Sequence, residues 1–177
     1  GTYGSDDLVE WFAERKKNVG TGALCGVILF AASSLQQYGI LLTDSAGKAG
    51  FITGLYMVFV PLCGIFMHKK IRPEAWIGAI IAVIGLYFVS FANGIEPVGF
   101  GDLVLVIGAF FWTAHIVVID RYAAEVSPLK FSMVQFIVCG ALCIFCALFT
   151  EEIHMAAVIE AKIPILYCGV MSVGVAY

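Results

Sequence analysis

Charge is scarce in this sequence. Only 13% of its 177 residues are Asp, Glu, Lys or Arg, against about 25% in soluble domains. The formal net charge is −3, and no stripe of basic residues is present. We therefore expect no nucleic-acid partner, since such partners select strongly basic surfaces.

Catalytic and metal-binding motifs are also missing. The sequence has no zinc-type His-Glu motif, no Gly-x-Ser-x-Gly and no phosphate-binding loop. Its six cysteines lie in apolar runs without His or acidic neighbours at ligand spacing. Cys139, Cys143 and Cys146 share one helix face, but we interpret them as small packing residues rather than a metal or redox site. We expect no enzyme activity, no metal and no cofactor.

Long apolar runs are what the sequence does contain. A bilayer core of roughly 30 Å is spanned by about 20 mostly apolar residues in a helix. Lipid offers the backbone no hydrogen bonds, so such runs form helices or closed barrels, and these runs lack the period-two alternation of barrel strands. They predict an all-α, polytopic membrane helical bundle whose surroundings are the lipid bilayer. The six runs are residues 20–42, 46–67, 75–92, 102–119, 131–149 and 161–177.

Lys and Arg residues gather at alternate junctions between these runs. Eight of the ten lie before the first run, between the second and third, or between the fourth and fifth. By the positive-inside rule these junctions face the cytoplasm. We therefore expect a multi-pass protein of the cell (cytoplasmic) membrane with loops 68–73 and 120–130 on the cytoplasmic side.

A short internal repeat suggests how the helices are organised. Leu24–Val27 (LCGV) in the first run is matched by Tyr167–Val170 (YCGV) in the last, 143 residues later. The second copy lies five helices after the first, in the sixth run, so the two copies cross the bilayer in opposite directions. Inverted repeats of this kind are common in secondary transporters, which hold substrate between their halves.

Four segments resemble helices of EamA-type permeases, which belong to the drug/metabolite transporter superfamily. They are Asp44–Leu55 with Val60–Leu62 (fourth helix), Gly78–Tyr87 (fifth), Gly101–Arg121 with Trp112, His115 and Asp120 (sixth), and Gln135-Phe136 (seventh). The resemblance covers residues 20–177 and implies two inverted five-helix halves, of which this sequence would hold the third to the eighth helix. We expect a cytoplasmic polar segment over 1–19, three helices of the first repeat over 20–92, an inter-repeat loop over 93–100, and three helices of the second repeat, truncated, over 101–177.

This resemblance implies transport of a small metabolite or drug-like solute, with export the expected direction, by alternating access of the two repeats. A membrane-embedded scaffold or receptor is the alternative, and an intramembrane enzyme is a weaker one. The partners expected are the bilayer and a small-molecule substrate. The sequence does not indicate an oligomeric state.

Two polar residues of the fourth run are the first candidates for a substrate cavity. His115 lies near the bilayer midplane, and Trp112 is three residues earlier on the same helix face. Trp112 would stack on substrate, and His115 would bind it or exchange a proton. The competing interpretation is a histidine bonded to a backbone carbonyl beside a packing tryptophan.

The first two runs supply the other cavity candidates. Ser33 and Gln37 share a helix face at a spacing of four, while the adjacent Gln36 points about 100° away. Their alternative role is interhelical hydrogen bonding. Tyr56 reaches the midplane from the second run, and Lys48 either attracts an anionic solute or extends to the interface.

The sequence says less about proton coupling and about the helix motions that transport would need. No acidic residue lies near the midplane of any run, so proton coupling, if present, would use His115 or helices outside this sequence. Asp120 is expected at a solvated helix end, and facilitated diffusion is equally open. We predict a role in helix packing or hinge motion for Gly22, Gly26, Gly50, Gly54 and Pro61.

Overall fold

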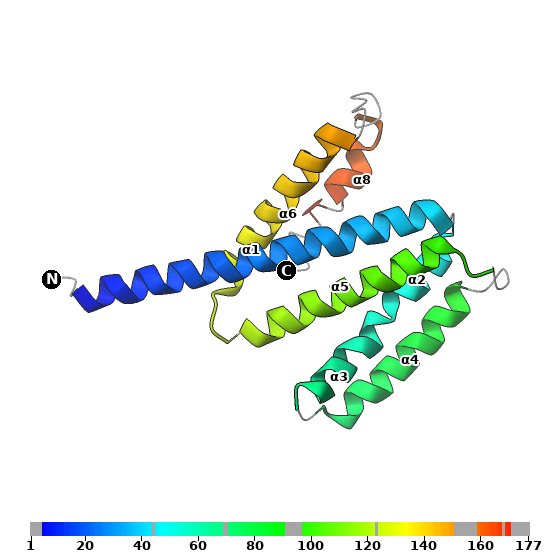
Figure 1. The fold of residues 1–177 in the computed structure, drawn as a ribbon, viewed down its shortest axis with the longest axis horizontal. Coiled ribbons are helices and arrows are strands. Elements are labelled where there is room, and N and C mark those ends of the chain that lie inside the picture. Colours follow the sequence, from blue (N-terminus) through cyan, green and yellow to red (C-terminus); the bar gives the residue numbers. More distant parts are fainter. Residues whose placement is uncertain are drawn as a thin grey trace. The chain divides into compact units, whose positions relative to one another are not determined.

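The computed structural model describes residues 5–43, 45–68, 71–90, 97–122, 124–150, 159–167 and 169–170. The regular elements within these ranges are helices, and no strand occurs among them (Figure 1). The predicted all-α fold is therefore confirmed. The chain divides into two compact units, Gly1–Leu142 and Cys143–Tyr177. The candidate site lies in the first unit.

The first helix is longer than the apolar run that predicted it. α1 spans Ser5–Thr43, so it begins well before Gly20, where the apolar run starts. Most of the expected polar segment 1–19 thus belongs to this helix. The physical reason is that residues 5–19 contain neither Gly nor Pro, and polarity limits the depth of membrane insertion without ending a helix.

The second apolar run is broken into two helices. α2 covers Ala46–Gly54 and α3 covers Tyr56–Phe66, with Leu55 as a turn between them. The Leu55 N–H donates to the Ile52 carbonyl at 3.2 Å, a tight three-residue turn in place of a full α-helical one. Pro61, the predicted kink, lies inside α3 instead.

Three further helices follow the predicted runs closely. α4 spans Pro73–Ser90, α5 spans Phe100–Tyr122 and α6 spans Pro128–Thr150. Proline stands first in α4 and α6, where its fixed φ and missing N–H suit the start of a helix. Of the sixth run, the structure describes α8, Lys162–Tyr167, while residues 168 and 171–177 lie outside the described residues.

Several of these helices are long and apolar enough to cross a bilayer. Among the described residues four candidates meet this standard, at residues 16–43, 46–66, 100–122 and 128–150, and residues 73–88 form a shorter apolar helix. Leu41, Phe66 and Phe88 are between 70% and 83% exposed. Such exposure is unfavourable in water but suits side chains that face lipid.

The first unit is built around α5. This helix has its most extensive contact with α1 and also packs on α2 and α3, while α4 packs against α2 and α3 (Figure 1). Small residues allow α1 and α5 to approach: a Cβ on Gly101 would lie 2.8 Å from Thr43 Cγ2, and one on Gly108 would lie 3.4 Å from Leu35 Cβ. Since the residue number rises along α1 as it falls along α5, the two helices are antiparallel.

Candidate functional site

Three helices bring polar and aromatic side chains together near the middle of the first unit. Trp112 on α5 donates from Nε1 to Oε1 of Gln36 on α1 at 2.9 Å. Its ring also lies 6.4 Å from that of Tyr56 on α3, measured between centroids. An indole N–H buried in an apolar region needs such an acceptor, and the bond fixes the ring against Tyr56.

His115 continues this group one helical turn along α5. Its ring meets that of Trp112 edge-on, with centroids 6.1 Å apart. His115 Nε2 forms a hydrogen bond of 3.1 Å with Oε1 of Gln135, on α6. His115 is 4% exposed and Gln135 is fully buried. The bond joins two helices through side chains, whereas the packing interpretation had supposed a backbone carbonyl as the partner.

The predicted cavity residues of α1 separate in the structure. Gln36 faces Trp112, but the next residue, Gln37, is exposed. The Ser33 hydroxyl donates to the Leu29 carbonyl at 2.7 Å, within its own helix. The structure therefore brings Gln36, Trp112, His115 and Tyr56 together, and places Ser33 and Gln37 outside these contacts.

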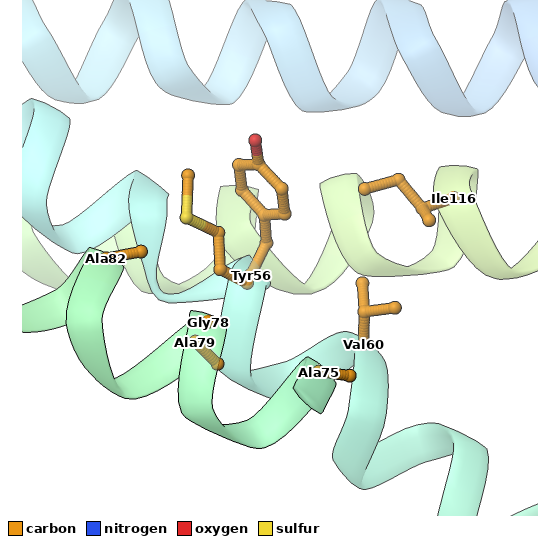
Figure 2. Close-up of a pocket in the computed structure, with 8 residues that line it drawn as sticks. Tyr56, Val60, Ala75, Gly78, Ala79, Ala82 and Ile116 are labelled. Carbon is orange, nitrogen blue, oxygen red and sulfur yellow. The ribbon is translucent and has the colours of Figure 1, made fainter. Parts of the chain in front are cut away.

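A hollow between α3, α4 and α5 adjoins this group at Tyr56. One part, about 300 Å³, is lined by Tyr56, Met57 and Val60 of α3 and by Ile116 of α5. Figure 2 shows the Tyr56 ring pointing away from α4. The α4 side of this part is made of small residues at helical spacing, Ala75, Gly78, Ala79 and Ala82.

The hollow continues toward the ends of α3 and α5. Its second part, about 460 Å³, shares Met57, Val60, Ala75 and Ile116 with the first. Its further lining comes from Pro61, Gly64, Met67, Ile71, Val117 and Asp120. The lining is mainly apolar, with Tyr56 at one end and Asp120 at the other.

The predicted glycine pairs differ in what they pack against. A Cβ on Gly22 would lie 2.8 Å from Val134 Cβ, and one on Gly26 would lie 2.7 Å from the Gln135 carbonyl oxygen, so both face α6. Gly54 packs against the Leu86 side chain of α4. Gly50 is exposed, with open space where a Cβ would stand.

A buried ion pair lies where α2 and α5 begin. Lys48 Nζ is 2.7 Å from Asp102 Oδ2, and the two side chains are only 9% and 7% exposed. Lys48 also donates to the Pro97 carbonyl at 2.6 Å, and the Gly99 N–H donates to Asp102 Oδ2 at 2.7 Å. The partner of Lys48 is therefore neither a solute nor the interface, the two targets expected from the sequence. The opposite charges of Lys48 and Asp102, both close to one predicted membrane surface, were the signal that could have indicated this pair.

The opposite end of α1 is also held to the loop after α5. Asn18, 3% exposed, accepts a hydrogen bond of 2.8 Å from the Ser127 N–H. Lys17 forms an ion pair with Glu125, which lowers the pKa of the Glu125 carboxyl by hydrogen bonding and charge attraction. Among the described residues, no cluster of three or more potential metal ligands occurs.

Comparison with known proteins identifies the family. The model of the EamA-like transporter family matches residues 8–91 and 99–177. The chain belongs to this family. One curated relative, an uncharacterized transporter of Archaeoglobus fulgidus, is 30% identical over 108 residues. The match covers 60% of this chain and 34% of the relative, so the chain spans about a third of that protein's length. No solved structure matches.

Membership in the EamA-like family confirms the resemblance drawn from the sequence. It agrees with the apolar helices in making the chain a multi-pass membrane protein. The division into two inverted repeats and the roles of the candidate residues remain predictions.

Proposed function

We propose that this EamA-like chain is part of a carrier that moves a small metabolite or drug-like solute across the cell membrane. The observation that supports this most directly is the hollow between α3, α4 and α5, which meets a polar group at Tyr56. Its two parts, about 300 and 460 Å³, have the size of small-molecule sites.

The lining indicates how a solute would be held. Met57, Val60 and Ile116 offer apolar contact, which needs no particular partner and suits several solutes. Tyr56 adds a ring face and a hydroxyl to this lining. Trp112, with its partner Gln36, lies beside Tyr56, and His115 lies beside Trp112. A solute with an apolar body and one or two polar groups fits this arrangement.

Alternating access is the mechanism we propose. The helices over 20–92 and those over 101–177 would move as inverted repeats and expose the hollow to either side in turn. The larger part of the hollow reaches Met67, Ile71 and Asp120, next to the junctions that the basic residues assign to the cytoplasm. Entry of the solute from the cytoplasm, and therefore export, is the direction this placement favours.

Proton coupling, where it operates, would use His115 in this proposal. An imidazole can gain or lose a proton, and the hydrogen bond between His115 and Gln135 links α5 to α6. A protonation change would then alter the contact between two helices. Facilitated diffusion, which needs no such group, remains the simpler alternative.

The proposal is tested by filling the hollow. In the full-length protein, Val60→Trp places a large ring between α3, α4 and α5, so we expect loss of solute flux with normal membrane abundance. A growth screen over amino acids, nucleosides and drugs identifies the solute for proteoliposome flux. Ile65→Trp is the control, because Ile65 lies on the same helix but is 52% exposed.

Equal flux in wild type and Val60→Trp would show that solute does not pass through this hollow. Equal loss in both tryptophan variants would show a general effect on α3. A full-length protein that moves no solute, in agreement with a scaffold or receptor, would overturn the carrier proposal itself.

A further inference from the structure

Two opposite charges are buried together at one end of the helix bundle. Lys48 lies in the first turn of α2 and Asp102 in the first turn of α5. Asp102 Oδ2 forms an ion pair with Lys48 Nζ and accepts a hydrogen bond from the Gly99 N–H, each at 2.7 Å. The buried Oδ1 of Asp102 has no hydrogen-bond partner among the described residues. A carboxylate is favoured at a helix N-terminus, but its burial there is costly unless it is paired.

The pair also joins parts of the chain that belong to different predicted repeats. Lys48 is in the first repeat and Asp102 in the second, while the Pro97 carbonyl that Lys48 contacts lies in the expected inter-repeat loop. A buried ion pair is weak support for stability, since apolar residues of similar size often stabilise as well. A role in setting which segments meet explains its presence better.

The two ends of α5 differ in packing. At the Asp102 end the helices are closed: a Cβ on Gly101 would lie 2.8 Å from Thr43 Cγ2, and Val104 and Leu105 are buried. At the Asp120 end α5 lines the larger part of the hollow. These ends are about 27 Å apart along the helix. The Asp102 end of α5 is thus sealed by close contact with α1 and α2, while the Asp120 end borders a hollow with α3 and α4.

We propose that the Lys48–Asp102 pair is a latch between the two repeats that holds one end of the carrier closed while the hollow is open at the other. This inference rests on the proposed function. Lys48 and Asp102 are positioning residues: the pair forms in this state and parts when the opposite end closes. Unlatching should therefore open the sealed end and close the hollow together.

Cysteine labelling in the full-length, otherwise cysteine-free protein tests the latch without a known solute. One reporter is Thr53→Cys, 7% exposed and beyond Lys48 along α2. The other is Val117→Cys, which lines the hollow. A membrane-impermeant maleimide is applied to right-side-out and inside-out vesicles. Lys48→Met with Asp102→Leu removes both charges, so that neither remains buried alone.

We expect the double variant to raise labelling at position 53 and to lower it at position 117, each roughly tenfold for a population shift of this kind. Lys48→Asp with Asp102→Lys should return both rates toward wild type. Arg72→Ala is the control, because it breaks an ion pair with Glu74 whose side chains are 83% and 68% exposed. It should change neither rate.

A rise at both reporters would mean that the pair only stabilises the fold, and unchanged rates would mean that it holds nothing closed. Either result overturns the latch. Opposite changes in a protein that moves no solute would keep the latch and overturn the carrier proposal, so the two failures are distinguishable.

Discussion

At the scale of single residues, three hydrogen bonds of polar side chains join separate segments of the first unit. Gln36 meets Trp112, His115 meets Gln135, and the Asn18 side chain caps the Ser127 N–H. In a lipid environment a polar group without a partner is costly, so each pair fixes the rotation of two segments about their axes. These pairs position the aromatic group beside the hollow.

The Gln36–Trp112 bond should be measurable as a coupling energy. We expect Gln36→Leu and Trp112→Phe to destabilise the protein non-additively, with a coupling of about 1 kcal/mol, typical of hydrogen bonds between membrane helices. The measurement is a double-mutant cycle on the free energy of unfolding in detergent micelles. Gln37→Leu with Trp112→Phe is the matched control and should be additive. Equal coupling for both glutamines would contradict the bond.

The Lys17–Glu125 pair should give a small, pH-dependent contribution to stability. Lys17 lowers the pKa of Glu125 in the folded protein, so the contribution is present above the unfolded pKa and is lost as pH falls through the folded value. The side chains are 44% and 50% exposed, so solvent and salt screen the pair.

We therefore expect Lys17→Met to lower the thermal midpoint slightly at neutral pH and low salt, and not at acid pH or high salt. Thermal unfolding against pH and ionic strength checks this, with the neighbouring exposed Lys16→Met as control. A decrease that persists at acid pH would assign the effect to packing of the Lys17 stem.

At the scale of the elements, glycines decide where helices touch. Gly22 and Gly26 bring α1 against α6, and Gly101 and Gly108 bring α5 against α1. Close backbone approach at small residues is the usual basis of helix association in membranes, where apolar side chains gain little by leaving lipid. The packing of the first unit therefore depends on glycine, which has no side chain to hold the helices apart at these contacts.

Gly26→Ala should separate α1 from α6. Its Cβ would stand 2.7 Å from the Gln135 carbonyl oxygen, a backbone atom that cannot rotate away. We expect a loss of about 1–3 kcal/mol in the free energy of unfolding, as for other overpacked sites. Gly50→Ala is the control: its Cβ meets open space, and removing a helical glycine should stabilise by up to about 1 kcal/mol. A neutral Gly26→Ala would contradict this packing.

Hydropathy predicted the helices well, because length and apolarity alone decide whether a segment can cross lipid. It did not predict that α1 begins at Ser5, because a hydropathy pattern does not detect the polar part of a helix. Nor did it predict that the second run breaks at Leu55, which depends on a local backbone bond. Which glutamine meets Trp112 depends on the rotation of α1 about its axis. Adjacent residues point about 100° apart on a helix, and the sequence alone does not say which of the two faces α5. Predicting the Lys48–Asp102 pair would have required knowing which helix ends meet.

At the scale of the whole molecule, α5 of this EamA-like chain is sealed at one end beside a buried ion pair and borders a hollow at the other. We propose that the sealed end faces outward and the hollow faces the cytoplasm, where the basic junctions lie. Both the export direction and the sidedness of the latch depend on each apolar helix, including the shorter α4, crossing the bilayer.

The most direct test of this arrangement places single cysteines at positions 72 and 98, which flank α4 and are exposed. Intact cells producing the full-length, otherwise cysteine-free protein are treated with a membrane-impermeant maleimide. We expect labelling at position 98 in intact cells, and at position 72 only after permeabilisation. Labelling of both positions from outside would show that α4 does not span the membrane. Labelling of position 72 alone would show that the protein has the opposite orientation, which would contradict the proposed path.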